Sequence, residues 1–291
     1  MLALASIGAL VFFSLPRAEP IINDQPLTFW LNQLPTANLE YASPECQRAL
    51  AAMDDRCIPV LIHKLSWKPS PILRHLGLRW FDFALDLEPQ DQRAQAILVL
   101  ARFGPRASNA VPSLSRLNQL SYSEDETGSP LRGAAIAALI MIRHDSAEAC
   151  ARKSLELSEP KKDDYQFAIL SLGTNAVSCV STFIIAIETA TNEDVKCQAA
   201  LSLGYIHSSP ELSLPILVSM LSETNVQSRR SAAYALSLFR EAAKPAWNDL
   251  VKHSDDPDQG VRHSTVKALY YIDPNAAAQL GIEIPGASEY F

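Results

Sequence analysis

Glycine is scarce in this chain, and the motifs that carry most enzyme chemistry are missing. Only ten of the 291 residues are glycine, which argues against a β-sandwich or β-barrel, because those folds depend on many tight turns. No HExxH, GxSxG, GxGxxG or P-loop motif occurs. The six histidines include no pair at the i, i+4 spacing of a helical metal site. The sequence therefore predicts no catalytic residue, no cofactor site and no metal site.

The chain also has fewer basic than acidic residues. The chain has 25 lysines and arginines against 32 aspartates and glutamates, a formal net charge of −7. Proteins that bind nucleic acid usually carry a basic balance or a basic stripe, because phosphate neutralisation supplies much of their affinity. The composition therefore disfavours a nucleic-acid partner.

The five cysteines form no CxxC pair, which argues against a zinc site or a redox-active dithiol. Several lie in apolar segments, where a free cysteine behaves as a small buried hydrophobe. We favour that interpretation for all five. A disulfide between Cys46 and Cys57 stays open as the alternative.

The chain starts with an apolar run of 14 residues, Leu2–Leu15, and its first charge is Arg17. A membrane-spanning helix needs about 20 apolar residues, whereas a run of this length suits the core of a signal peptide. We therefore predict that residues 1–18 are a signal peptide or an N-terminal membrane anchor. The rest would then be exported, either periplasmic or tethered to the inner membrane of a bacterium, with membrane contact only through this segment. A buried first helix is the alternative.

The main feature of the chain is an internal repeat. Seven segments share one spacing of residue types, and their last strong apolar anchors are Met53, Leu100, Leu139, Leu172, Leu203, Leu236 and Leu269. The last five anchors are 33, 31, 33 and 33 residues apart. Four residues before each anchor stand Ala49, Ala96, Ala135, Ala168, Ala199, Ala232 and Thr265. Small and apolar residues at spacings of three, four and seven share one face of an α-helix, so each segment predicts a helix that its neighbours approach closely.

Basic residues recur seven positions before the anchor, near the start of each helix. They are Arg93, Arg132, Lys196, Arg229 and Arg262. The start of a helix is electrostatically unfavourable for a cation. We therefore expect each of these side chains to meet a partner charge or to reach a neighbouring repeat.

A second helix is expected in each unit, commonly with a proline in its first turn, as at Pro59, Pro112, Pro215 and Pro245. Proline is tolerated there because its missing N–H has no partner within the helix. One helix pair cannot bury its own apolar stripe, but a stack of copies can. The sequence predicts an all-α protein, an α-solenoid of about seven two-helix repeats over residues 43–284, with a tail at 285–291.

The repeat resembles the HEAT family, and in particular its PBS-lyase-like repeats. Arg93 to Pro105 reads RAQAILVLARFGP and Ala110 to Leu114 reads AVPSL, which is similar to that family's pattern. The resemblance covers residues 43–281 and implies a fold rather than an activity. Pro26 to Leu34 resembles the capping helix of exported bacterial HEAT-repeat proteins, so residues 19–42 are expected to form a linker and a capping helix.

Two insertions interrupt the repeat, near residues 67–88 and 121–130. The first is rich in aromatic residues, and Trp67, Arg74, Trp80 and Phe83 are candidate partner-binding residues, since Trp and Arg are enriched at interface hot spots. The alternative is an extra helix packed across the first repeats. The second insertion is acidic and suggests a solvated loop.

These patterns favour a non-catalytic scaffold that binds another protein, of unknown identity, on the inner curve of the solenoid. We expect the second helices to line that curve. No small-molecule substrate is inferred. The alternatives are an enzyme or enzyme subunit related to PBS-lyase-type HEAT proteins and, more remotely, a nucleic-acid-binding protein. His253, Asp255, Asp256 and His263 are the densest titratable group, and we expect its aspartates to cap helices rather than bind metal.

Overall fold

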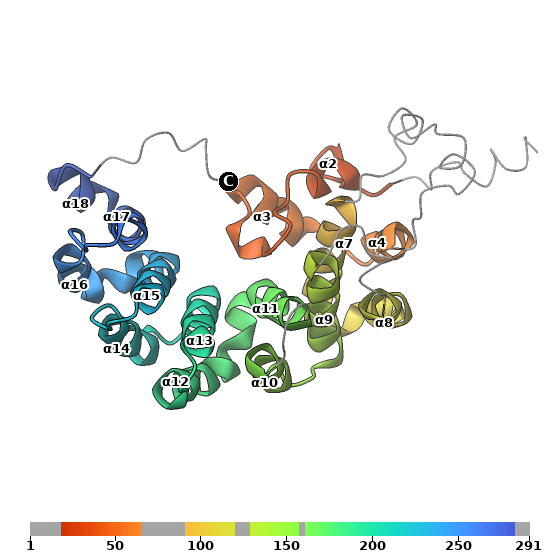
Figure 1. The fold of residues 1–291 in the computed structure, drawn as a ribbon. Helices are drawn as coiled ribbons and strands as arrows, with labels where there is room; N and C mark the ends of the chain where they lie inside the picture. Colours follow the sequence, from red (N-terminus) through yellow and green to blue (C-terminus); the bar gives the residue numbers. More distant parts are fainter. Residues whose placement is uncertain (1–18, 66–90, 120–128, 157–160, 283–291) are drawn as a thin grey trace, which may run out of the picture. The chain divides into compact units, whose positions relative to one another are not determined.

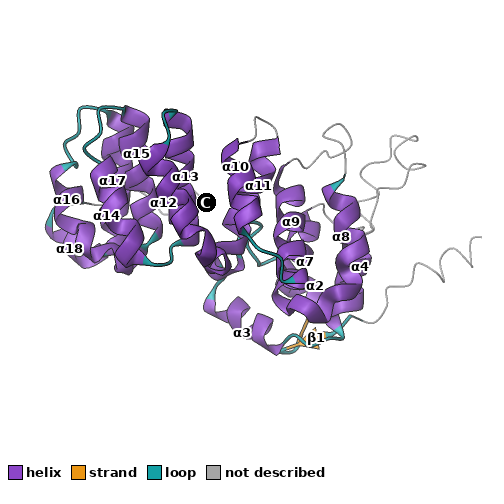
Figure 2. Cartoon of the chain, turned by 90° about the horizontal axis from the view of Figure 1, so that it is seen from below, coloured by secondary structure: helices purple, strands orange, loops and turns teal. Residues whose placement is uncertain are grey.

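A computed structural model of the protein describes residues 19–65, 91–119, 129–156 and 161–282. The chain divides into two compact units, Met1–His144 and Asp145–Phe291, each of which is described by itself. Helices make up most of both units and lie side by side within each (Figures 1 and 2). The predicted all-α fold of stacked helices is confirmed within each unit.

The N-terminal unit starts with a short antiparallel hairpin that the sequence did not predict. Its strands pair Ile21 with Pro26 and Ile22 with Gln25. The turn residues Asn23 and Asp24 have φ values of 48° and 62°, the left-handed conformation that a two-residue hairpin turn requires. The hairpin occupies part of the segment expected to be a linker.

The described elements of this unit follow in simple order. They are β1 (Ile21–Ile22), β2 (Gln25–Pro26), α2 (Leu27–Leu31), η1 (Leu39–Tyr41), α3 (Pro44–Ala52), α4 (Cys57–Leu65), α7 (Asp91–Phe103), η2 (Gly104–Ala110), α8 (Val111–Asn118) and α9 (Ser129–Arg143). Helix α2 lies at the position of the expected capping helix. It buries Leu27 and Leu31 and packs against α7.

The described residues of the C-terminal unit form successive α-helices with 3-10 segments between some of them. Its elements are α10 (Glu148–Glu156), α11 (Lys161–Leu172), η3 (Gly173–Cys179), α12 (Val180–Thr189), α13 (Glu193–Ile206), α14 (Pro210–Met220), α15 (Val226–Leu238), η4 (Arg240–Ala246), α16 (Trp247–Lys252), α17 (Gln259–Ile272) and α18 (Pro274–Gln279). Asn192, Asn225 and Asp258 cap the starts of α13, α15 and α17 with side-chain oxygens, which satisfies backbone N–H groups that have no partner inside the helix.

Small residues let the first helices of this unit pack closely. Ala199, Ala232, Ala235 and Ala268 are fully buried. A Cβ atom on Gly204 would lie 2.8 Å from the Cα of Ala235, so α13 and α15 approach as near as their backbones allow. The second helices carry larger core residues, including Leu214, Leu217, Met220 and Leu250.

This asymmetry curves the C-terminal unit in the direction opposite to our expectation. Helices α13, α15 and α17 lie on the concave side of the unit, and α12, α14 and α16 lie on the convex side (Figure 1). The prediction that second helices line the inner curve is therefore wrong here. Helices with small side chains at their contacts pack at a shorter interaxial distance than helices with large ones. The first helices, which carry the small residues, therefore lie on the concave side.

The structure also corrects the register of the fourth repeat. The 3-10 helices that follow α7, α11 and α15 start at Gly104, Gly173 and Arg240, and these residues have φ values of 56°, 51° and 50°. Each stands four residues after its anchor if the fourth anchor is Ile169 rather than Leu172. Both residues are buried, so apolar periodicity alone did not separate them.

Proline also marks helix starts less reliably than expected. Pro112 does lie in the first turn of α8. Pro215, in contrast, lies inside α14, which starts at Pro210. The proline that starts this helix is therefore the earlier one.

One stretch of the described residues, Asp163–Thr189, is long and apolar enough to cross a membrane by length and composition alone. It comprises α11, η3 and α12, and Ala176 inside η3 departs from helical φ/ψ. Its core residues Ile169, Leu172 and Phe183 are buried within the protein. Packing between helices accounts for its apolar composition.

Candidate binding surface

Basic residues near the helix starts join neighbouring repeats. The Arg229 guanidinium donates to both carboxylate oxygens of Asp256, with Nε–Oδ2 2.7 Å and Nη2–Oδ1 3.0 Å, and Asp256 lies in the turn before α17. Arg229 also donates to the carbonyls of Glu223 and Thr224 in the turn before its own helix. Similarly, the Lys196 Nζ of α13 lies 3.7 Å from Oε1 of Glu223, which stands in the turn before α15. The predicted link between repeats is confirmed for these residues, and it holds α13, α15 and α17 in a fixed arrangement.

The concave surface of these three helices presents one recurring pair of positions, two residues before and two residues after each anchor. The pairs are Leu201 and Tyr205 in α13, Tyr234 and Leu238 in α15, and Lys267 and Tyr271 in α17. Residues four apart share a helix face, and this face points away from the buried alanines. All six side chains are half-buried. We call these six residues the inner face.

Aromatic rings and cations gather at one end of the inner face. The Lys267 Nζ lies 6.0 Å from the ring centroid of Tyr234 and 5.7 Å from that of Tyr271. The Arg240 guanidinium carbon lies 5.6 Å from the Tyr271 centroid. These distances suit cation–π attraction. We call Tyr234, Arg240, Lys267 and Tyr271 the tyrosine–cation cluster.

The two cations of the cluster are not neutralised from within the described part of the chain. No carboxylate of the described residues lies within 4.0 Å of the Lys267 amine or the Arg240 guanidinium. Burial, and next the neighbouring Tyr271, raise the pKa of Tyr234 above its usual value, so its phenol stays neutral at physiological pH. The cluster is therefore a positively charged surface with uncharged aromatic walls.

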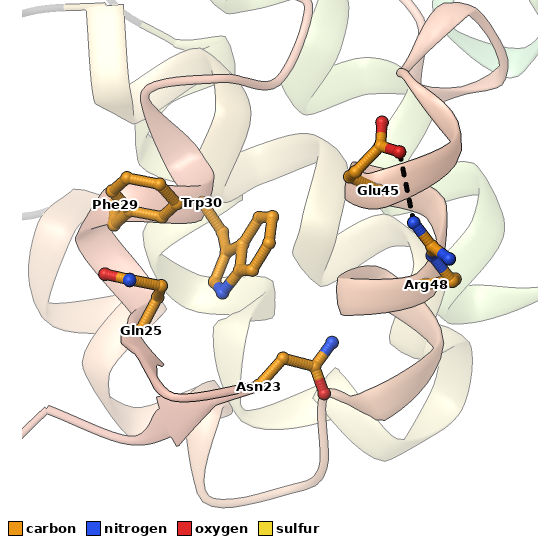
Figure 3. A pocket seen from close by; sticks show the side chains of 6 residues that line it. All are labelled: Asn23, Gln25, Phe29, Trp30, Glu45 and Arg48. Carbon is orange, nitrogen blue, oxygen red and sulfur yellow. Dashed lines mark hydrogen bonds and ion pairs between the residues drawn. The ribbon is translucent and has the colours of Figure 1, made fainter.

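A second concave feature lies in the N-terminal unit. An open pocket of about 400 Å³ is lined by Asn23, Gln25, Phe29, Trp30, Glu45 and Arg48 (Figure 3). The buried Trp30 indole forms its inner wall and donates from Nε1 to the carbonyl of Ile22 at 2.8 Å. The Arg48 guanidinium is paired with Glu45 at 3.1 Å. The wall is apolar, and the one cation at the rim already has its counter-ion.

The cysteine thiols are free, and burial makes several of them poor nucleophiles. All five cysteines are free thiols, and all but Cys197 are buried, in line with the prediction that they are packed hydrophobes. Burial raises the pKa of Cys150 to about 12 and also raises the pKa values of Cys57 and Cys179, so these thiols are protonated and poorly nucleophilic. Within the described ranges, no three His, Cys, Asp or Glu side chains are grouped so that they could hold a metal ion.

A comparison with protein families finds a match over the helices that carry the inner face. Residues 180–270 match the family model described as HEAT repeats. A search of curated proteins found no match. The family match covers just under a third of the chain.

Two solved structures are similar at low identity. A crystal structure of an engineered protein is 19% identical, with 77% of this chain and 98% of that chain covered and a TM-score of 0.36. A structure of human deoxyhypusine hydroxylase in complex with glycerol is 17% identical, with 79% of this chain and 78% of that chain covered and a TM-score of 0.35.

The HEAT repeats contain most of the surface just described, whereas the sequence placed its candidates elsewhere. Trp67, Arg74, Trp80 and Phe83 lie outside the described residues and stay candidates. In the group around His253, the expectation that its aspartates cap helices is wrong: Asp256 accepts from Arg229, and Asp258, which lies outside that group, caps α17.

Sequence reasoning missed the tyrosine–cation cluster. A signal was present, because Tyr205, Tyr234, Lys267 and Tyr271 all stand two residues from an anchor. Those positions lie opposite the buried face of each helix, where helix stacking does not fix the residue type.

Proposed function

We propose that this chain is a non-catalytic scaffold that binds another protein on the inner face of its C-terminal HEAT repeats. The tyrosine–cation cluster is the observation that carries the proposal. Tyr and Arg are among the residues most enriched at interface hot spots, and half-buried aromatic rings lose little entropy when a partner covers them. Stacked helices with linked turns also present a preformed surface, which lowers the ordering cost of binding.

Affinity capture with the full chain as bait tests this proposal. The Tyr271→Ala variant should lose the partners that the wild-type chain enriches, since it removes the ring that both cations contact. Tyr165→Ala is the matched control, because its ring also contacts a cation, Lys153 at 5.3 Å, but lies outside the inner face. Equal loss with both variants, or no loss with Tyr271→Ala, would contradict the use of this surface.

The same experiment tests the aromatic insertion as a second surface. Its support is the cluster of Trp67, Arg74, Trp80 and Phe83 in one break of the repeat. A variant with Trp67→Ala and Trp80→Ala should lose partners that Tyr271→Ala retains. If the double variant enriches the same proteins as wild type, the insertion has no binding role.

Export of the chain is a separate part of the proposal. The apolar run Leu2–Leu15 supports it, because such a run is typical of the core of a signal peptide. Alkaline phosphatase fused after residue 18 should be active in a bacterial host, since that enzyme needs an oxidising compartment. An inactive fusion that is present in the cytoplasm would contradict export.

A further inference from the structure

We infer that the inner face binds an extended, acidic segment of its protein partner, with carboxylates of that segment placed over the tyrosine–cation cluster. The inference rests on the proposed function and narrows it to one chemical class of partner. It concerns helices α13, α15 and α17 and the residue Arg240 at the start of η4.

Charge complementarity selects this partner. The chain as a whole carries a net charge of −7, yet the cluster holds two cations without a carboxylate of the described residues beside them. A third cation, Arg230 of α15, reaches the start of α17, where its guanidinium carbon would lie 3.6 Å from a Cβ atom on Gly260. No ion pair to Arg230 occurs among the described residues either. Asp194 of α13 stands seven residues before Leu201, and His263 of α17 stands four residues before Lys267, so both lie on the same side of their helices as the inner face.

The rings hold the cations in position for a carboxylate. Lys267 lies between two tyrosines, and Arg240 lies over the outer one. A long flexible side chain normally loses rotamer freedom when it forms an ion pair. Here ring contacts have already restricted that freedom, so less of the attraction is lost on binding. A carboxylate can accept from either cation without displacing it from its ring.

The rest of the inner face is apolar and suits apolar residues of the partner segment that flank the carboxylate. Leu201 and Tyr205 lie on α13 and Leu238 on α15, so apolar groups precede the cations as one crosses from α13 to α17. Neighbouring helix axes lie about 8–10 Å apart, and an extended chain advances about 3.3 Å per residue. A segment of about six residues therefore crosses the three helices, apolar at one end and acidic at the other.

Fluorescence polarisation with the full chain tests the inference. The probe is a fluorescein-labelled peptide with leucine and glycine in one half and glutamate and glycine in the other. Its matched partner carries glutamine in place of each glutamate. We expect the glutamate probe to bind about tenfold more tightly, as two exposed ion pairs allow, and we expect added salt to reduce the difference.

Protein variants separate the inner face from general charge effects. Lys267→Gln combined with Arg240→Gln should weaken the glutamate probe about tenfold and leave the glutamine probe unchanged. Lys252→Gln is the matched control: it removes an exposed lysine of α16, which pairs with Asp249 on the same helix, and it should change neither probe. Circular dichroism and thermal melting of each variant establish that it is folded.

Several results would overturn the inference. One is equal binding of the two probes, and another is equal weakening by the control variant. A third is a labelled oligothymidine that binds more tightly than the glutamate probe and depends on the same two cations, which would assign the surface to nucleic acid. If the acidic probe fails while capture of a protein partner still depends on Tyr271, the inference is wrong and the proposed function stands. If capture fails as well, both are wrong.

Discussion

At the scale of single residues, Arg240 combines backbone strain with a surface role. It adopts φ 50° at the turn where two other repeats place Gly104 and Gly173. A residue with a Cβ atom is disfavoured in this conformation by about 1 kcal/mol, although His207 at the corresponding turn has φ 35° as well. Such strain persists where another requirement keeps the side chain, and the contact of Arg240 with Tyr271 is a requirement of that kind.

We therefore expect Arg240→Gly to raise the free energy of unfolding by about 0.5–1 kcal/mol, since glycine relieves the strain at a modest entropic cost. Chemical denaturation measures this change. Gly104→Ala is the reverse test: a Cβ atom there would meet nothing within 4 Å, so only backbone strain can lower its stability. If Arg240→Gly is less stable than wild type, the contacts of the arginine side chain stabilise the fold by more than its backbone strain destabilises it.

Asp256 should make the C-terminal repeats sensitive to acid. The hydrogen bonds from Arg229 hold the pKa of its carboxyl below the usual range. Because the folded-state pKa lies below that of the unfolded chain, the stabilisation is complete above pH ~4 and is lost as pH falls through the folded-state value. Asp256→Asn should therefore cost about 2 kcal/mol near neutral pH and progressively less below pH ~4.

Denaturant melts of Asp256→Asn and the wild-type chain at several pH values measure this difference. Asp255→Asn is the matched control, because Asp255 is exposed and the structure gives it no hydrogen bond or ion pair among the described residues. A constant difference between Asp256→Asn and wild type down to pH ~3 would contradict the pKa shift.

At the scale of helices, the contact between α13 and α15 depends on one glycine. Adding a Cβ atom to Gly204 would place it 2.8 Å from the Ala235 Cα and 3.0 Å from the Leu238 Cδ1. Backbone cannot move aside as a side-chain end can, so Gly204→Ala should destabilise the chain by about 2 kcal/mol. The same change at Gly260 meets only the side chains of Asp258 and Arg230 and gains helix propensity. Thermal melting should separate the two variants, and similar losses would mean that the helices can part freely.

The helices were predictable because their cause is periodic. Alanine, serine and glycine recur where neighbouring helices touch, as at Ala199, Ala232 and Gly204, and stacking makes that recurrence necessary. The fourth register was wrong by three residues because Ile169 and Leu172 are both apolar, and only the left-handed turn at Gly173 separates them. The inner face was not predictable in the same way, since its residues vary from repeat to repeat: Leu201, Tyr234 and Lys267 occupy equivalent positions.

At the scale of the whole molecule, repeat proteins are stabilised locally, because each repeat contacts only its neighbours. In the N-terminal unit, the Lys64 side chain is 2% exposed. Its amine donates to Gln92 Oε1 at 3.1 Å and lies 3.8 Å from Glu19. Glu19 in turn accepts from the backbone N–H of Thr28 in α2. This buried lysine therefore joins α4, α7 and the capping helix.

Lys64→Met removes the charge and keeps most of the volume, so it should lower the stability of the N-terminal unit by about 3 kcal/mol by removing the cation beside the Glu19 carboxylate. Hydrogen exchange should quicken in α2, α4 and α7 and stay unchanged in α13, α15 and α17, whose protection depends on their own neighbours. Adding Glu19→Gln should recover part of the loss, because the carboxylate charge is then gone. Exchange that quickens equally in both units would instead show one cooperative molecule, and the inner face would then depend on a lysine in the other unit.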